Sequence, residues 1–379
     1  HEGATPPWLP GVMERRTGAA VAVVLAATGA LVVLPTPRLV LEAVAFEQIR
    51  RWYSWMKNIL PWVHRVLGRG GAAATAASPS CQCQVPGLPA LLPIQRLSDR
   101  VIRVVACNPG KFTLNGTNTY LVGTGKRRIL IDSGEGRASY IPLLEKAMAE
   151  AGCEELEAIL CTHRHYDHIG GLESVYAALG KRVPTYKCTR EGPEWSEYKY
   201  NSHEPSTVEF LHLEDGQLFE TEGATLQTVL TPGHSEDHAC FLLLEEPSIF
   251  AGDNVLGHGS SWFEVLDDYM ASLRRMAALI KKHSPGFQLL YTGHGPEVAH
   301  AERKVTEYIR HREAREEQIL QVLRSSRRGT SLQVARTIYP SVPTSIFFAA
   351  HSNVRSHLFS MEKRGMVKRA FWELWSVAE

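Results

Sequence analysis

The sequence predicts a layered α/β fold. Between residues 94 and 291, short apolar runs of strand length are interspersed with longer stretches whose apolar residues recur at helical spacing. The strands do not alternate strictly with helices, and no G-x-G-x-x-G motif follows a strand, which disfavours a dinucleotide-binding fold. Side chains that suit divalent metals follow several of the apolar runs. These observations favour layers of sheet and helix over a helical bundle.

The length and composition are those of a globular protein with room for two domains. The chain has 379 residues, of which 44% are hydrophobic and 21% charged. The formal net charge of +1 indicates no class of partner, but residues 310–369 contain 12 Lys and Arg against 4 Asp and Glu. Seven cysteines without regular spacing predict reduced thiols.

Residues 1–90 form an N-terminal extension that differs from the rest of the chain. Arg15 and Arg16 precede an apolar run at 18–34, which is close to the lower length limit for crossing a bilayer. Residues 39–67 are rich in basic and aromatic side chains, and 68–80 have the small residues of a linker. We expect a targeting or anchoring segment followed by a linker. Membrane association of residues 1–67 and an artefact of gene annotation are both open alternatives.

The predicted catalytic domain spans residues 91–300. Its strands are expected at 101–106, 119–122, 128–131, 158–161, 183–185, 208–213, 225–230, 240–244, 249–251 and 289–291. Its helices are expected at 141–151, 172–179 and 269–282.

Residues 301–379 are predicted to form a second, helical domain. Helices are expected at 301–324, 331–338 and 345–364, and a β wing at 367–375 follows the helix breaker Gly365. Three helices followed by a wing are typical of a winged-helix-like module. Because the basic excess lies here, we expect the module either to bind a phosphate backbone or to cover the active site without touching nucleic acid.

A dense group of metal-binding side chains lies in the segment THRHYDHIGG at 162–171. Its four potential ligands are His163, His165, Asp167 and His168. Imidazole and carboxylate groups suit zinc and similar divalent metals, and side chains two apart in extended backbone point the same way. Gly170 and Gly171 allow a tight turn into the next helix. This order after a strand predicts a metal site.

Three further candidate ligands follow apolar strands downstream, each beside a glycine. They are His234, Asp253 and His294. Each is a weak signal alone, but the repeated order of strand, glycine and ligand gathers the side chains at one sheet edge. The seven ligands together suffice for two metals with open positions for water. Two other histidines near these motifs, His238 and His258, are expected at the surface, with a position beside the metal ligands as the alternative.

Several segments resemble the metallo-β-lactamase superfamily, and more particularly the β-lactamase-like protein 2 family of mitochondrial endoribonucleases in the glyoxalase II-like group. They are CNPGKFTLNGTNTYLVGTGKRRILIDSG (107–134), THRHYDHIGG (162–171), LTPGHSEDHACFLL (230–243), FAGDNVLG (250–257) and YTGHGPEV (291–298). The likeness continues through HREAREEQIL (311–320) and covers roughly 93–370. HxHxDH marks only the superfamily, whereas the opening segment together with the C-terminal module is more particular.

The resemblance implies an αββα sandwich with a C-terminal winged-helix-like domain and two Zn²⁺ per chain. His163, His165 and His234 would hold one zinc, and Asp167, His168 and His294 the other, with Asp253 bridging. Asp167 would steer the proton of the attacking water. Asp132 would orient a ligand imidazole, with a simple turn carboxylate as the alternative.

The same resemblance implies a zinc-dependent endoribonuclease that hydrolyses single-stranded RNA with a metal-bound hydroxide and needs no nucleotide cofactor. The alternative is a thioester hydrolase of the glyoxalase II or polyketide type, and a third interpretation is a membrane-tethered binding protein with incidental zinc. The resemblance implies a location in the mitochondrial matrix, and an N-terminus that contains Arg and few acidic residues agrees with it. A cytoplasmic location is the alternative.

Overall fold

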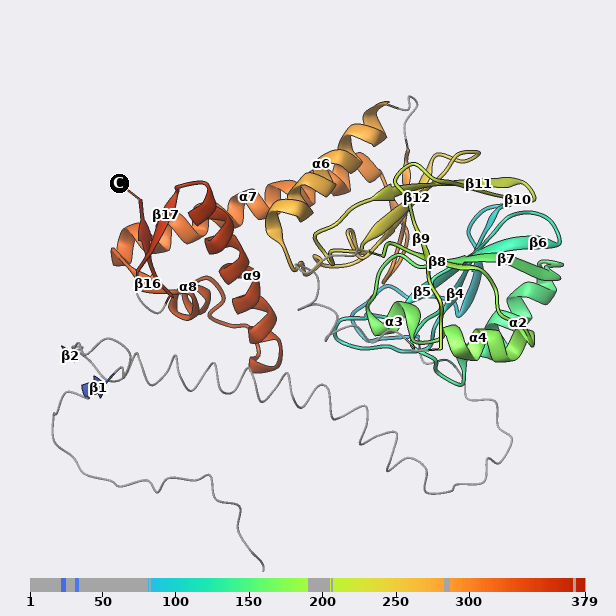
Figure 1. Cartoon of the computed structure of the whole chain (residues 1–379), viewed down its shortest axis with the longest axis horizontal. Coiled ribbons are helices and arrows are strands. Elements are labelled where there is room, and N and C mark those ends of the chain that lie inside the picture. Colours follow the sequence, from blue (N-terminus) through green and yellow to red (C-terminus); the bar gives the residue numbers. More distant parts are fainter. Residues whose placement is uncertain are drawn as a thin grey trace, which may run out of the picture. The chain divides into compact units, whose positions relative to one another are not determined.

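The computed structural model describes residues 22–24, 31–33, 81, 83–189, 205, 207–282, 287–370 and 373–378, without the side chains of 22–24, 31–33, 344–346 and 348. The chain divides into two compact units, His1–Thr75 and Ala76–Glu379 (Figure 1). In the first unit, β1 (Ala22–Val24) pairs with β2 (Leu31–Val33). The rest of the predicted anchor and linker up to residue 80 lies outside the described residues. Among the residues described, no helix has the length and apolar character needed to cross a membrane.

The first layer of strands in the second unit is a seven-stranded sheet of order β3-β4-β5-β6-β7-β8-β9. Its strands are β3 (Ile94–Arg96), β4 (Val101–Val105), β5 (Asn118–Val122), β6 (Arg127–Ile131), β7 (Glu155–Leu160), β8 (Thr185–Lys187) and β9 (Leu211–His212). Pairing is antiparallel from β3 to β6 and parallel from β6 to β9. Helices α2 (Tyr140–Glu150) and α4 (Leu172–Leu179) share an apolar core with one face of this sheet.

The second layer of strands is a six-stranded sheet of order β10-β11-β12-β13-β14-β15. Its strands are β10 (Leu218–Thr221), β11 (Ala224–Leu230), β12 (Ala239–Leu243), β13 (Ser248–Gly252), β14 (Leu289–Thr292) and β15 (Val298–Ala299). Only the pair β13–β14 is parallel. Helix α6 (Leu266–Lys282), which connects β13 to β14, and the first turns of α7 (Ala301–Ser326) pack on one face.

The two sheets pack face to face through alternating side chains. On β5, Tyr120 points between the sheets, where its ring centroid lies 5.1 Å from that of Phe250 on β13 and 5.5 Å from that of Tyr291 on β14. Its neighbour Leu121 belongs to the core shared with α2, because successive residues of a strand face opposite sides. Helices thus cover the outer face of each sheet, and the predicted αββα sandwich is confirmed (Figure 1).

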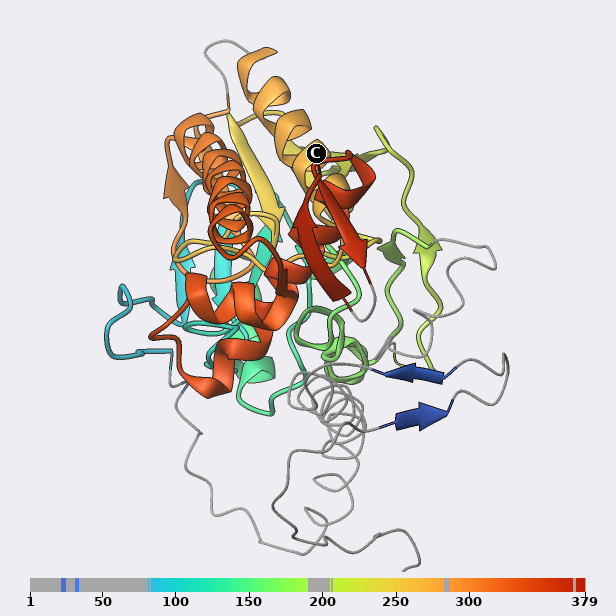
Figure 2. The ribbon, with the colours of Figure 1, turned by 90° about the vertical axis from the view of Figure 1, so that its left-hand side faces the viewer.

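The C-terminal module contains the expected helices and a small sheet. The helices are α7, α8 (Ser331–Ile338) and α9 (Thr344–Lys363), and the sheet has the order β16 (Gly329–Thr330), β18 (Leu374–Val377), β17 (Val367–Ala370). They enclose a separate core around the buried Trp375. Helix α7 joins the module to the sandwich, because its first half packs beside α6 (Figure 2). The winged-helix comparison stays a prediction.

One prediction about the cysteines is wrong. Cys81 and Cys107 form a disulfide, whereas the sequence predicts reduced thiols. The two residues meet because the segment before β3 packs on the loop between β4 and β5, where Asn115 Nδ2 donates to the Cys83 carbonyl at 2.8 Å. A separation of 26 residues carries no local signal for this contact. The other five cysteines are buried.

Candidate metal centre

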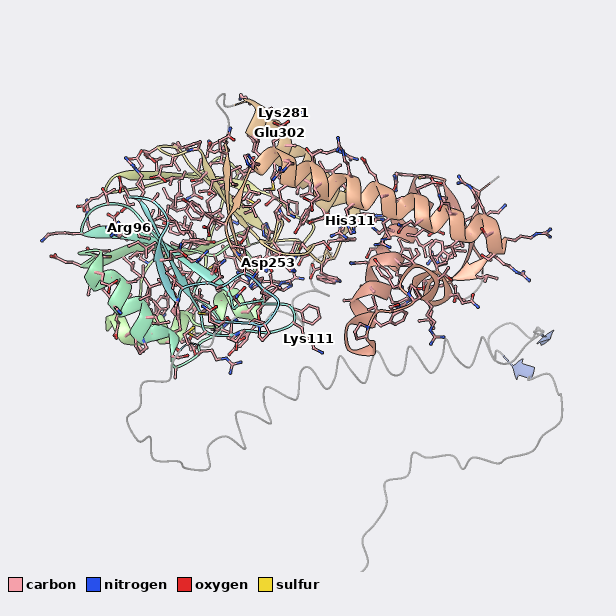
Figure 3. All side chains as sticks on the ribbon, turned by 180° about the vertical axis from the view of Figure 1, so that it is seen from behind. Arg96, Lys111, Asp253, Lys281, Glu302 and His311 are labelled. Carbon is pink, nitrogen blue, oxygen red and sulfur yellow. A yellow bond between two sulfur atoms is a disulfide. The ribbon has the colours of Figure 1, made fainter. Side chains whose placement is uncertain are left out.

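The seven predicted ligands meet where strands of both sheets end. They form two groups, the first containing His163, His165, His234 and Asp253, and the second containing Asp167, His168 and His294. Within each group the potential ligand atoms lie within 4.8 Å of one another. The strands β7, β11, β13 and β14 each end just before one of these side chains. Figure 3 labels Asp253, directly after β13, and Lys111, on the loop between β4 and β5.

In the first group, three imidazole nitrogens converge on one point. His165 Nδ1 lies 2.8 Å from His163 Nε2 and 3.0 Å from His234 Nε2. Burial, together with the neighbouring histidines, holds the pKa of His163 well below its usual value and lowers the pKa of His165 to about 3. The rings are therefore neutral at pH 7, and neutral imidazole is the form that binds a metal. Three facing lone pairs suit a shared cation.

In the second group, one carboxylate lies beside two imidazoles. Asp167 Oδ2 lies 3.2 Å from His294 Nε2 and 3.4 Å from His168 Nε2. Burial alone would raise the pKa of Asp167, but the charges of His168 and His294 outweigh it and hold that pKa well below its usual value. Burial lowers the pKa of His294, yet Asp253 and Asp167 raise it to about 9. The side chains of the second group thus favour a positive charge between them. A divalent cation can supply that charge in place of protons.

Asp253 contacts both groups. Its carboxylate lies 3.2 Å from His294 Nε2, 3.5 Å from His168 Nε2 and 3.6 Å from His234 Nε2. Among the described residues, His168 Nε2 and Asp253 Oδ1 are buried and form no hydrogen bond. A buried polar atom without a partner is costly in a folded protein. The donor set and these two atoms fit divalent metal ions, and Asp253 lies where it could serve both groups.

The ring nitrogens that face away from the centre have defined partners. His168 Nδ1 lies 2.7 Å from Asp132 Oδ2, and His234 Nδ1 lies 2.7 Å from the Trp262 carbonyl. Asp132 is buried, has a φ of 57° and accepts the Thr162 N–H at 2.8 Å. The structure therefore places Asp132 in the predicted contact with a ligand imidazole. Such partners fix the tautomer and the orientation of a metal ligand.

Gly233 explains why one ligand follows a glycine. It has a φ of 129°, and a Cβ there would lie 2.1 Å from the Tyr269 backbone nitrogen. Only glycine allows this close approach of the His234 loop to the start of α6.

Several residues beside the centre were not found from the sequence. Thr117 donates its hydroxyl to Asp167 Oδ2 at 3.1 Å. His238 is 1% exposed and accepts the Asp253 N–H at 3.1 Å, so the expected surface position is wrong for this residue. His258 is exposed, as expected. The position of His238, four residues after His234 and just before β12, was the signal available for it.

Arg164, between two ligands of the His cluster, is also buried. Its guanidinium donates to Glu236 at 2.6 Å and to Glu264 at 2.7 Å. These contacts tie the end of β7 to the loop after β11 and to the segment before α6. The sequence offered no specific signal for this clamp, because its three members are far apart along the chain.

Glu264 should make stability pH-dependent. Burial raises its pKa to about 7, against the lowering effect of Arg164 and with the help of Asp237 and Glu236. Because the pKa of Glu264 is higher in the folded state than in the unfolded state, protonated Glu264 favours folding. This contribution to stability is fully present below the unfolded-state pKa near 4.5 and is lost as the pH rises through about 7. We expect the unfolding free energy of the wild type to fall relative to Glu264→Gln between these pH values, by up to about 1.4 kcal/mol per pH unit. Urea titrations at several pH values measure this difference, and parallel curves would contradict it.

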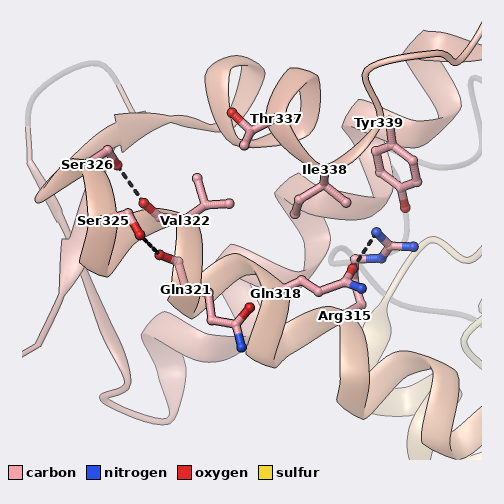
Figure 4. A pocket seen from close by; sticks show the side chains of 9 residues that line it. All are labelled: Arg315, Gln318, Gln321, Val322, Ser325, Ser326, Thr337, Ile338 and Tyr339. Carbon is pink, nitrogen blue, oxygen red and sulfur yellow. Dashed lines mark hydrogen bonds between the residues drawn. The ribbon is translucent and has the colours of Figure 1, made fainter.

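A groove of about 660 Å³ lies in the C-terminal module, apart from the metal-binding residues (Figure 4). It runs between α7 and the end of α8, and its lining includes Gln318, Gln321 and Tyr339. The Arg315 guanidinium lies 4.3 Å from the centroid of the Tyr339 ring. The groove thus combines amide groups with a cation–aromatic pair.

An αββα sandwich with two His/Asp clusters at its strand ends defines a class of metal-dependent hydrolases. Residues 112–296 match the Metallo-beta-lactamase superfamily. The Beta-lactamase-like protein 2 homolog of Caenorhabditis elegans is 38% identical over 292 residues, which cover 76% of this chain and 93% of that protein. The chain belongs to the metallo-beta-lactamase superfamily, and its predicted likeness to the β-lactamase-like protein 2 family is confirmed.

The chain is also similar to a fungal enzyme and to a bacterial protein of known structure. The Atrochrysone carboxyl ACP thioesterase of Aspergillus fumigatus is also 38% identical, over 282 residues that cover 71% of this chain and 83% of that protein. A metallo-beta-lactamase family protein from Thermus thermophilus has a similar structure, with a TM-score of 0.60 and 24% identity, and the match covers 74% of this chain and 100% of that chain. The structural likeness shows the shared fold.

Proposed function

We propose that this chain is a zinc-dependent endoribonuclease that hydrolyses phosphodiester bonds of single-stranded RNA. The observation that carries the substrate class is a set of exposed basic side chains on the C-terminal module. They are Arg327, Arg328, Arg336 and Lys368, and none of them forms an ion pair within the part of the chain that the structure describes. Unpaired cations bind phosphates by releasing counterions, which supports a nucleic-acid substrate.

The two groups of ligands are proposed to hold one Zn²⁺ each, with Asp253 shared between them. Imidazole nitrogen and carboxylate oxygen are typical zinc ligands. Two such ions, when bound, supply a nucleophile from water at neutral pH and stabilise the attacking and leaving oxygens. In this proposal, Thr117 orients the Asp167 carboxylate by donating its hydroxyl, and Asp167, which stays ionised, accepts the proton of the attacking water.

Aromatic side chains near the centre support an unpaired nucleic-acid strand. The Trp262 ring centroid lies 6.2 Å from that of His234 and 6.4 Å from that of His165. Phe112, on the loop between β4 and β5, is 62% exposed, and Tyr166 is 40% exposed. The faces of such rings stack on bases with little dependence on sequence. We therefore expect weak sequence preference.

Neutralising the arginine pair tests the role of the module. In the double variant Arg327→Gln/Arg328→Gln, we expect KM for a labelled single-stranded RNA to rise while kcat stays near the wild-type value. The slope of log KM against log salt should fall by about 0.7 for each lost phosphate contact. Steady-state cleavage at several salt concentrations measures both quantities.

The matched control is Arg96→Gln, which removes an exposed arginine from β3, in the sandwich. It should leave KM and the salt slope unchanged. An equal effect of the control and the double variant would mean that total charge matters and that the module has no special contact with RNA.

A thioester hydrolase is the second candidate. The specific observation in its favour is the 38% identity to a protein named as an ACP thioesterase. The same ligand set would then serve attack on a thioester carbonyl. A thioester assay beside the RNA assay separates the two candidates.

A further inference from the structure

We propose that Arg312, a residue of the C-terminal module, is a positioning residue for the metal ligand His234. Arg312 lies on α7 and is 2% exposed. Its guanidinium lies over the rings of Phe263 and Tyr269, 4.8 and 5.6 Å from their centroids. A buried guanidinium held between aromatic faces has little freedom to move.

The guanidinium acts on the loop that connects β13 to α6. Arg312 Nη2 donates to the carbonyl of Ser261. The next carbonyl along the chain, that of Trp262, lies 2.7 Å from His234 Nδ1, and Ser261 Oγ lies 3.1 Å from the same nitrogen. Arg312 therefore holds the peptide unit directly before the one whose carbonyl accepts the His234 N–H. With the proton on Nδ1, His234 Nε2 is left to face His165 and Asp253.

A second side chain of α7 holds the same loop. Tyr308 is buried, donates its hydroxyl to the Gly259 carbonyl at 2.9 Å and accepts the Leu256 N–H at 3.1 Å. Two residues one helical turn apart thus hold the loop at Leu256, Gly259 and Ser261. The C-terminal module in this way reaches the metal centre without providing a ligand, so its contribution is separate from the proposed binding of RNA.

The expected consequence is a weaker metal site in the first group alone. Partners of ligand imidazoles change metal affinity by about 10- to 100-fold when they are lost. In Arg312→Met, we expect metal to leave the group of His163, His165 and His234 at least about tenfold faster than in the wild type. Release from the group of Asp167, His168 and His294 should keep its wild-type rate.

The test follows metal release from the full chain loaded with Zn²⁺ and mixed with excess chromogenic chelator. Release is expected in two kinetic phases, one for each group of ligands. The variant His294→Ala lacks a ligand of the second group, so the phase that it keeps belongs to the first group. Arg310→Met is the matched control, because Arg310 is exposed on the same helix. Arg312→Lys, which keeps a charged donor, should release metal at an intermediate rate and serves if Arg312→Met does not fold.

The inference rests on the metal centre of the proposed function and not on its RNA substrate. Unchanged release from the first group in both Arg312 variants, or equal acceleration of both phases, would overturn it. Uptake of no metal by the wild type would overturn this inference together with the proposed metal centre. Failure of RNA cleavage by a protein that shows the expected release would overturn only the endoribonuclease.

Discussion

Replacing Asp167 with alanine is expected to lower kcat for single-stranded RNA by about a thousandfold, as the loss of a positioned acid–base group does. The carboxylate lies within 3.4 Å of His168, His294 and Thr117. Its pKa is held well below the usual value because the two histidines outweigh the effect of burial, so the carboxylate is ionised at pH 7. Single-turnover cleavage with excess enzyme measures the chemical step.

The variant Glu145→Ala is the control, because it removes an exposed carboxylate from α2, away from the ligands. It should keep kcat within a few-fold of wild type. The conservative Asp167→Asn keeps the shape but not the charge, and it should be about as inactive as alanine. Wild-type cleavage by a folded Asp167→Asn protein would remove Asp167 from the proposed mechanism.

Asp253→Ala is expected to have an equally large effect on activity for a different reason. Asp253 contacts His168, His234 and His294, so it is shared by both groups of ligands. Its loss should lower the zinc content of the purified protein from two ions per chain to one or fewer, and kcat by about a thousandfold or more. Inductively coupled plasma mass spectrometry and the cleavage assay measure the two effects.

The exposed Asp268 on α6 provides the control for this change, and Asp268→Ala should keep the wild-type zinc content. Two tightly bound ions in Asp253→Ala would show that this carboxylate does not bridge them.

Most of the fold could be predicted from the sequence, because strands and helices have characteristic short-range patterns of apolar residues. The apolar runs at 225–230 and 249–251 became β11 and β13, and the helical spacing at 172–179 became α4 with the same bounds. The short strands β3, β10, β15 and β16 were not predicted, and the strand expected at 208–213 is only Leu211–His212. Their brief pairing depends on neighbours that are distant in the sequence.

The candidate site also has a part that the sequence predicts and a part that only the structure shows. The seven ligands could be predicted because each follows a strand at a recognisable motif. His238 was expected at the surface, because its position after His234 is a weak signal and its contact with Asp253 forms only after the strands are paired. Arg312 looks like one of many arginines on an amphipathic helix, and only the folded chain shows its contact with Ser261. Local pattern thus predicts ligands, whereas tertiary structure shows what orients them.

The most direct measurement is the cleavage of a labelled single-stranded RNA by the metal-free full chain as zinc is added back in steps. The proposed function predicts no cleavage without zinc, a rise that saturates near two equivalents, and no rise at any zinc level in Asp167→Ala. A folded wild-type protein that binds two zinc ions and cleaves no RNA would contradict the endoribonuclease and favour a thioester substrate.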